Sequence, residues 1–329
     1  MRLPDFDFIK PIKLEKALNA LHDYGKEAGI LAGGTDLLVN MKYRVKRPKT
    51  VISIKSVPEL RTISSDRKGV TNIGACVDLS ELSENGFIAE HFTSFRHAIR
   101  SIASRHIRNM ATIGGNLCLE TRCWYYNQSE QWRAARMPCH KLRGNICHAI
   151  KGSKRCHAIN SSDTAPILIA LDAEVSLEKK GHKRTIPVRE FYRDNGAKPN
   201  VVEPGEMLTS LLLPKQSRGS LSTFIKFATR KGLDFAEGNI AARGQQSGKN
   251  LTDVRLIIGS MASAPIVLKK ASEIIAESGL TEHAIEKAAE TVRTEMGTVT
   301  NLFTPAGYKR QMAEVLVKRA LLDLKSRIK

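Results

Sequence analysis

Four cysteines within one short stretch of the sequence have the chemistry to hold a metal together. They are Cys123, Cys139, Cys147 and Cys156, separated by 16, 8 and 9 residues. No pair has the C-x-x-C spacing of a zinc ribbon or knuckle, and the closely spaced cysteine run of bacterial ferredoxins is absent. Four thiolates can still close one tetrahedral metal site or hold a [4Fe–4S] cluster. The stretch lacks hydrophobic periodicity, so we expect a staple to order it.

The other side chains of this stretch have simpler explanations than metal chemistry. Each of the last three cysteines precedes a histidine, and we expect these histidines to be loop residues or hydrogen-bond donors around the site: His140, His148 and His157. We expect the aromatic residues to pack the loop down rather than to bridge electrons: Trp124, Tyr125, Tyr126 and Trp132. Nearby cations would offset the negative charge of a cluster: Arg122, Arg143, Lys154 and Arg155.

Two further cysteines are less suited to the same site. Cys118 is a fifth candidate ligand that we rank below the four, because it lies close to a glycine turn. Cys76 lies in an apolar segment, and we expect a buried core thiol there.

Two glycine turns about eighty residues apart provide a second possible site. Residues 32–36 (AGGTD) and 112–116 (TIGGN) each follow an apolar segment. Adjacent glycines let the backbone approach a ligand closely, and successive amide groups can point at an anion such as a pyrophosphate. Each turn alone could be a simple strand end, but the pair favours a ligand. Neither turn has the Rossmann fingerprint or the lysine of a Walker loop.

The elements that must position these residues follow from periodicity and breaker residues. We predict helices at residues 14–24, 37–41, 79–88, 94–104, 271–277, 282–295 and 305–326. We predict strands at residues 29–32, 50–54, 70–75, 175–177, 183–187, 221–229, 240–243 and 254–260, with a further strand inside 203–214. Residues 163–174 are regular and begin at Asp163, a possible helix N-cap. The polar segment 215–220 separates this region from a C-terminal α+β unit of strands followed by helices.

Composition narrows the class of protein. The chain has 329 residues, 42% of them hydrophobic, enough for two domains with real cores. We find no signal peptide and no apolar window long enough for a transmembrane helix, so we expect a cytoplasmic protein whose cysteines are thiols or ligands. The net charge of +19 is spread along the chain. Without a nucleic-acid-binding motif, it indicates an acidic partner at least as well as nucleic acid.

Five motifs in order resemble the FAD-binding medium subunits of the molybdenum hydroxylases, the xanthine and carbon monoxide dehydrogenase flavoprotein group. They are LAGGTDLL (31–38), ATIGGNL (111–117), SDTAPILIALDA (162–173), EMLTSLLLP (206–214) and FIKFATRKGLDFA (224–236). The resemblance implies a non-Rossmann FAD fold of the PCMH or vanillyl-alcohol-oxidase type at residues 1–217, in subdomains of about 1–56 and 57–217. A small α+β domain would follow at 218–329.

The resemblance also implies which residues contact the flavin. The first turn would supply Ile30, Leu31, Ala32, Gly33, Gly34, Thr35, Asp36 and Leu37. The second turn would supply Thr112, Ile113, Gly114, Gly115 and Asn116. Single positions elsewhere would be Ile102, Asp163, Leu208 and Lys226. A lysine near the flavin can stabilise its reduced, anionic form, although Lys226 could equally be a solvated strand residue.

The cysteines lie in an insertion at about residues 118–158. Family members have the SD-x-x-P segment within about ten residues of ATIGGNL, whereas Asn116 and Asp163 are 47 residues apart here. An insertion at this place with this cysteine spacing resembles that of 4-hydroxybenzoyl-CoA reductase β subunits, which implies a [4Fe–4S] cluster on Cys123, Cys139, Cys147 and Cys156.

The function implied by this resemblance is electron transfer. A ferredoxin-like donor would supply electrons, which would pass through the cluster and FAD to [2Fe–2S] centres in a small subunit and molybdenum in a large subunit. The three subunits would form a heterotrimer, dimerised as α2β2γ2, with no substrate site or catalytic residue on this chain. One alternative is an ordinary molybdenum hydroxylase FAD subunit that reduces NAD or a quinone. The other is a basic regulatory or nucleic-acid-binding protein folded by a zinc loop.

Overall fold

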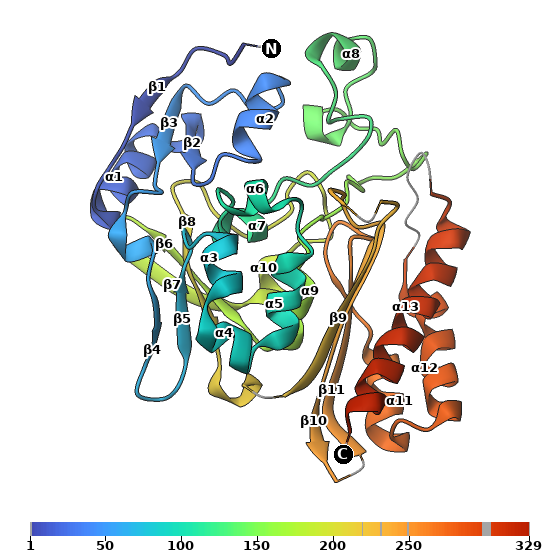
Figure 1. Cartoon of the computed structure of the whole chain (residues 1–329). Helices are drawn as coiled ribbons and strands as arrows, with labels where there is room; N and C mark the ends of the chain where they lie inside the picture. Colours follow the sequence, from blue (N-terminus) through green and yellow to red (C-terminus); the bar gives the residue numbers. More distant parts are fainter. Residues whose placement is uncertain (1, 219, 231, 249, 298–303, 329) are drawn as a thin grey trace.

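Three sheets organise the chain in the computed structural model, which describes residues 2–328 apart from 219, 231, 249 and 298–303 (Figure 1). A parallel sheet has the order β1-β3-β2, an antiparallel sheet has the order β4-β5-β8-β6-β7, and a second antiparallel sheet has the order β12-β11-β10-β9. Each sheet has its own buried hydrophobic cluster. This mixed α+β architecture has no Rossmann order.

The N-terminal unit is a small α/β layer. Its strands are β1 (Asp7–Ile9), β2 (Ala28–Leu31) and β3 (Thr50–Ser53), and its helices are α1 (Leu14–Tyr24), 3-10 helix η1 (Gly25–Glu27) and α2 (Leu37–Lys42). Helix α1 has the predicted bounds, because Ala17, Leu18 and Leu21 form one apolar face that packs with Ile52 of β3. Strand β2 ends at Leu31 and delivers the chain into the first glycine turn.

The middle unit holds the five-stranded sheet and a helical layer. Its strands are β4 (Ile63–Ser65), β5 (Thr71–Gly74), β6 (Glu174–Lys179), β7 (His182–Pro187) and β8 (Met207–Leu213). Its helices are 3-10 helix η2 (Pro58–Leu60), α3 (Leu79–Glu84), α4 (Gly86–His91), α5 (Thr93–Arg100), α6 (Arg105–Arg108), α7 (Ile113–Leu117), α9 (Thr164–Ala170), α10 (Val188–Phe191) and 3-10 helix η4 (Lys215–Ser217). The insertion adds α8 (Glu130–Ala134) and 3-10 helix η3 (His140–Leu142).

One predicted helix of the middle unit is wrong. Residues 79–88 form two helices, because Asn85 interrupts α3 and caps α4 with its Oδ1, which accepts from Ile88 N at 3.1 Å.

The C-terminal sheet is covered on both faces (Figure 1). Its strands are β9 (Leu221–Phe227), β10 (Gly238–Ser247), β11 (Asn250–Gly259) and β12 (Ile266–Val267), and its helices are α11 (Lys269–Ser278), α12 (Glu282–Glu295) and α13 (Ala306–Arg327). Alternate residues serve the two faces: Ile240 and Ala242 join the core under these helices, and Ala241 joins the core of the middle unit. Strands β10 and β11 run farther than predicted because their polar ends form an exposed hairpin.

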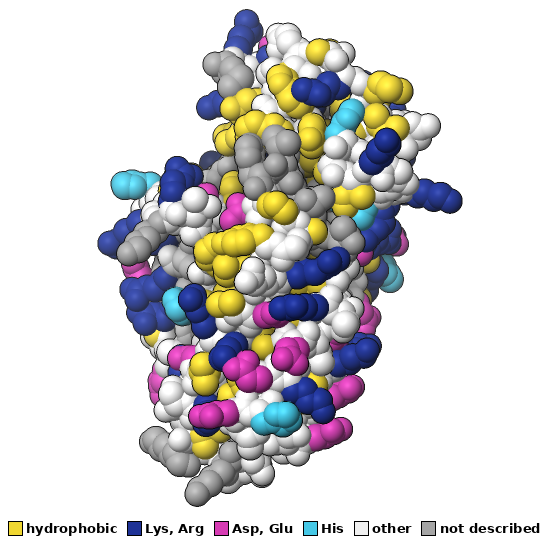
Figure 2. All heavy atoms as spheres, turned by 90° about the vertical axis from the view of Figure 1, so that its right-hand side faces the viewer, with side chains coloured by type: hydrophobic (Ala, Val, Ile, Leu, Met, Phe, Trp, Pro, Cys, Tyr) yellow, Lys and Arg dark blue, Asp and Glu magenta, His cyan; other side chains and the backbone are white. Residues whose placement is uncertain are grey.

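The charged side chains are mixed on the face shown in Figure 2, where acidic and basic groups alternate over the lower part and hydrophobic groups gather above. The excess of positive charge is therefore not confined to one patch of that face. Within the described ranges, no helix is both long and apolar enough to span a membrane.

Candidate functional site

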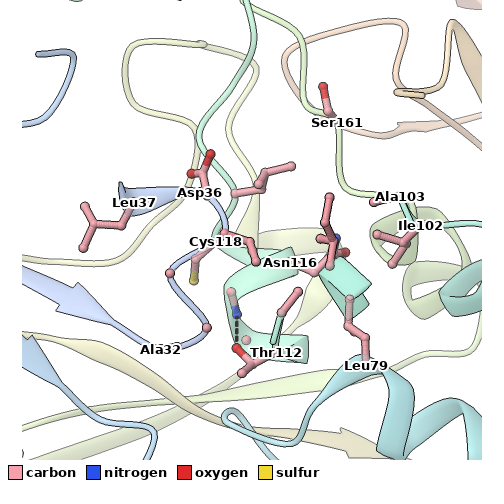
Figure 3. Close-up of a pocket in the computed structure, with 18 of the residues that line it drawn as sticks. Ala32, Asp36, Leu37, Leu79, Ile102, Ala103, Thr112, Asn116, Cys118 and Ser161 are labelled. Atoms are coloured by element: carbon pink, nitrogen blue, oxygen red, sulfur yellow. Dashed lines mark hydrogen bonds between the residues drawn. The ribbon is translucent and has the colours of Figure 1, made fainter. Parts of the chain in front are cut away.

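A cavity of about 520 Å³ lies where the N-terminal and middle units meet (Figure 3). This is the volume range of small-molecule and cofactor sites. Fourteen of the seventeen predicted flavin-contacting residues line it: Ile30, Ala32, Gly33, Gly34, Thr35, Asp36, Leu37, Ile102, Thr112, Gly114, Gly115, Asn116, Asp163 and Leu208. Residues far apart in the sequence are thus brought to one hollow.

Both glycine turns pack tightly against neighbouring backbone, and the first turn does so against the residues just before the second. A Cβ placed on Gly33 would lie 1.9 Å from the Met110 carbonyl oxygen, and one on Gly114 would lie 2.7 Å from the Ala75 Cβ. Neither position has room for a side chain, so both turns require glycine. Thr112 Oγ1 accepts a hydrogen bond from Gly115 N at 3.2 Å, which orders the second turn (Figure 3).

Asp163 lies at the cavity wall in a buried ion pair. Its Oδ2 accepts from Lys226 Nζ at 2.8 Å, and its Oδ1 accepts from Asn239 Nδ2 at 2.8 Å. Burial raises the pKa of Asp163, and Lys226 and Asn239 oppose that rise. Nearby, Asn116 Oδ1 accepts from Ser162 Oγ and Thr164 Oγ1, at 2.8 and 2.6 Å, so the two sides of the insertion meet again at the cavity.

Three predicted contact residues do not line the cavity. Lys226 Nζ donates to Asp163, to the Ser101 carbonyl (2.9 Å) and to the Asp234 carbonyl (3.0 Å). All three of its N–H donors are used within the protein, so it stabilises residues of the cavity wall. Ile113 is fully buried in the core of the middle unit. Leu31 is the last residue of β2 and is absent from the lining.

Other residues line the cavity without having been predicted. The segment between β9 and β10 contributes Arg230, Leu233, Asp234 and Phe235. Leu233 and Phe235 are half exposed, at 51% and 53%, and so form an apolar rim. This segment belongs to the motif FIKFATRKGLDFA, in which Lys226 alone was predicted to contact the flavin. The motif itself was therefore a sequence signal for these residues. From the insertion come Cys118 and Arg122, for which no signal existed.

The four cysteines of the insertion line one small second cavity. Cys123, Cys139, Cys147 and Cys156 share its wall with His140, Lys141 and His148, among others. As the side chains are placed, no three His, Cys, Asp or Glu groups of the described residues stand close enough to hold a metal ion. Burial raises the pKa of Cys123 to about 11 and raises that of Cys156. Without a cation, these buried cysteines stay in the thiol form. Binding of a metal cation would convert them to thiolates.

Polar contacts staple the insertion to the end of α2. Buried Arg133 donates to the carbonyls of Tyr43 and Arg44, at 3.1 and 3.0 Å. Lys46 pairs with Glu120 at 2.7 Å. These polar contacts order the insertion, as its lack of hydrophobic periodicity led us to expect. A bound metal would add to them.

A buried lysine supplies positive charge at the cysteine cavity. The Lys141 side chain is 3% exposed, and its Nζ donates to Glu120 Oε1 at 2.6 Å and to the Thr121 carbonyl at 2.9 Å. Burial alone would raise the pKa of Glu120, but Lys141 and Lys46 outweigh burial and lower it to about 2. This Lys46–Glu120–Lys141 cluster carries a net charge of about +1 beside the thiols.

The cations that we expected around the cysteines are placed differently. Arg122 faces the large cavity, and Arg155 pairs with Asp194 at 2.6 Å. Arg143 and Lys154 are exposed. Lys141 was missed because nothing in its local sequence indicates that it is buried.

The histidines and aromatic residues of the insertion have mostly structural contacts. His140 and His148 lie within hydrogen-bond distance of the carbonyls of Ser153 and Met137, at 3.0 and 2.9 Å, and His157 bonds Ser153 Oγ at 2.7 Å. Tyr126 is buried, and the Lys141 Nζ lies 4.6 Å from its ring centroid. Trp124 is half exposed, so packing does not account for all four aromatic residues. Cys76 is fully buried, as predicted.

Family comparisons cover nearly the whole chain. Residues 4–216 match the family described as "FAD binding domain in molybdopterin dehydrogenase". Residues 223–324 match the "CO dehydrogenase flavoprotein C-terminal domain".

Individual relatives and solved structures agree with these matches. The chain is 27% identical to the 6-hydroxypseudooxynicotine dehydrogenase complex subunit alpha of Paenarthrobacter nicotinovorans, over 98% of this chain and 95% of that one. It is 29% identical to the aldehyde oxidoreductase FAD-binding subunit PaoB of Escherichia coli, over 92% and 94%. The fold matches carbon monoxide dehydrogenase from Hydrogenophaga pseudoflava with a TM-score of 0.83, 24% identity and full coverage of both chains.

Proposed function

This chain belongs to the family of FAD-binding subunits of the molybdenum hydroxylases, and from that premise we propose that it is the electron-transfer flavoprotein subunit of a 4-hydroxybenzoyl-CoA reductase. In this proposal it takes electrons from a ferredoxin-like donor and passes them toward [2Fe–2S] and molybdenum centres on partner subunits. The net reaction on a partner subunit is reductive dehydroxylation to benzoyl-CoA. The observation that carries the proposal is the single cavity lined by Cys123, Cys139, Cys147 and Cys156.

The large cavity suits FAD. The backbone can pack closely at Gly33 and Gly114, where a Cβ would collide. The amides of residues 113–116 already donate within the protein, so donors toward a diphosphate would come from the first turn. Asp163 offers a hydrogen-bond acceptor at the wall, fixed by Lys226 and Asn239. Bound FAD would supply one- and two-electron redox chemistry. The residues of this chain would bind and orient it, with Leu233 and Phe235 as an apolar rim.

We infer that the small cavity is where a [4Fe–4S] cluster would bind. Four thiol side chains face it from one insertion, the number that such a cluster needs. Lys141 lies buried at its wall, where its charge opposes the negative charge of thiolate ligation. The insertion is held at the end of α2 by Arg133, which donates to the carbonyls of Tyr43 and Arg44.

Metal and flavin analysis tests this proposal. We would purify the chain anaerobically with its partner subunits and measure iron, acid-labile sulfide, zinc and FAD. We expect Cys139→Ser to lose about four irons and four sulfides per FAD relative to wild type while FAD is retained. Cys118→Ser is the matched control, because Cys118 faces the other cavity, and its iron content should equal that of wild type.

The second candidate function is an ordinary molybdenum hydroxylase FAD subunit that reduces NAD or a quinone. It is favoured by the relatives, which include a nicotinate dehydrogenase FAD-subunit of Eubacterium barkeri and carbon monoxide dehydrogenase medium chains. Equal iron in wild type and Cys139→Ser, with FAD present, would select this candidate. Zinc without FAD would refute both candidates and favour a zinc-folded loop.

A further inference from the structure

The neck of the insertion joins the two cavities. The entering and leaving segments pair at Arg122 and Ile159, where each backbone N–H donates to the carbonyl of the other at 2.8 Å. Arg122 lines the large cavity, and the next residue, Cys123, lines the cysteine cavity. One peptide bond therefore connects the walls of the two sites.

The Arg122 side chain contacts two other parts of the chain. Its Nη2 pairs with Asp36 Oδ1 in the first glycine turn, and its guanidinium carbon lies 5.1 Å from the ring centroid of Phe235. Arg122 Nε is buried and has no hydrogen-bond partner among the described residues. An unpaired buried donor at a cavity wall is available to a ligand or a water molecule.

Both sides of the neck are fixed to the walls of the large cavity. On the entering side, the backbone N of Glu120 donates to Asp36 Oδ2 at 3.2 Å. On the leaving side, Asn160 N donates to the Ala262 carbonyl at 2.9 Å, and the next residue, Ser161, lines the large cavity. Cys123, which follows Arg122 directly, is therefore connected through the neck to residues that would contact the flavin.

We propose that Arg122 couples the two sites, so that a filled cysteine site raises the affinity for FAD and bound FAD slows loss of the metal centre. This inference rests on the proposed function. Ligation would fix Cys123 and with it the Arg122 backbone, holding the guanidinium on Asp36 and Phe235. When the cysteine site is empty, the Arg122 segment becomes ordered only as FAD binds, and the lost conformational entropy weakens FAD binding. Reciprocity of the two effects is required by thermodynamic linkage.

FAD titration of loaded and stripped protein tests the coupling. Quenching of flavin fluorescence under anaerobic conditions gives Kd for cluster-loaded wild type and for wild type stripped by chelation. We expect Kd to rise on stripping by on the order of tenfold. In Arg122→Met this ratio should fall to about one, whereas the matched control Arg143→Met, an exposed arginine of the same insertion, should keep the wild-type ratio.

The reciprocal measurement and a conservative variant keep the test decisive. Iron release to a chelator should be slower with FAD than without it in wild type, by a factor similar to the Kd ratio. Arg122→Lys keeps the pairing with Asp36 but loses the planar group over Phe235, so it should give an intermediate ratio even if Arg122→Met is poorly folded. Equal Kd values for cluster-loaded and stripped wild type, or a wild-type ratio in both Arg122 variants, would overturn the coupling alone. Equal iron and sulfide in wild type and Cys139→Ser would overturn the proposed function, and the coupling with it.

Discussion

Replacing Gly33 by alanine should separate the two glycine turns and weaken FAD binding. The new Cβ would lie 1.9 Å from the Met110 carbonyl oxygen, whereas C···O contacts ordinarily stay at about 3.3 Å or more, so the turns must move apart by about 1.4 Å. Met110 cannot yield freely, because its carbonyl also accepts from Lys55 Nζ at 3.2 Å. A shift of that size would break a backbone hydrogen bond donated by the first turn to a diphosphate oxygen of bound FAD.

The expected effect on affinity follows from the energy of one such bond. A hydrogen bond to a charged group is worth about 1.5–3 kcal/mol, so Kd for FAD should rise about 10- to 150-fold in Gly33→Ala. Isothermal titration of the apo-protein with FAD measures this. Gly86→Ala is the matched control, because no atom lies within 4 Å of the added methyl group, and its Kd should not change.

Thermal melting of both apo-variants separates a binding defect from unfolding. If Gly33→Ala is folded at the titration temperature and binds FAD within about twofold of wild type, the two turns do not close on the cofactor, and the cradle that we infer from them is wrong.

Two further predictions concern buried charge. Lys226→Met should lower the free energy of unfolding by about 3–5 kcal/mol, because it leaves the Asp163 carboxylate without its cation. Burial raises the pKa of Asp163 and Lys226 opposes that rise, so the loss of stability measured by urea unfolding should shrink as pH falls from 8 to 5. A loss of stability that does not depend on pH would contradict this account. Protonation of Glu120 should cost wild type about 3 kcal/mol of unfolding free energy as pH falls from about 4.5 to about 2, the range set by the lowered pKa of Glu120. Glu120→Gln should lack that loss. If unfolding free energy depends on pH in the same way in both proteins, Lys46 and Lys141 do not stabilise the carboxylate.

Local sequence patterns predicted the elements that carry their own periodicity. Helix α1 follows from Leu14, Leu18 and Leu21, and strand β3 follows from a β-branched run. The break at Asn85 could not be distinguished from a continuous helix, because asparagine is tolerated inside helices as well as at their caps. The two glycine turns were recognisable because their backbone requirement is written in the residues themselves.

The parts of the site that depend on long-range docking were not predictable. Lys226 resembles a cavity lysine in sequence, yet its three donors are taken by Asp163 and two backbone carbonyls. Lys141 is as polar as the exposed Arg143 two residues later, and only the docking of the insertion on α2 buries it. Arg122 reaches Asp36 across 86 residues of sequence, and no local pattern encodes that approach.

The pairing of Arg122 with Ile159 also brings the two ends of the insertion together, so the insertion could be replaced by a short turn. Its two hydrogen bonds are those of a hydrogen-bonded antiparallel pair, whose Cα atoms are about 5.5 Å apart, and a two-residue Asn-Gly turn closes such a pair. Residues 123–158 can thus be excised without stretching the scaffold on either side. The same geometry makes this junction a site where a segment can be inserted or removed without displacing the flanking strands of the scaffold.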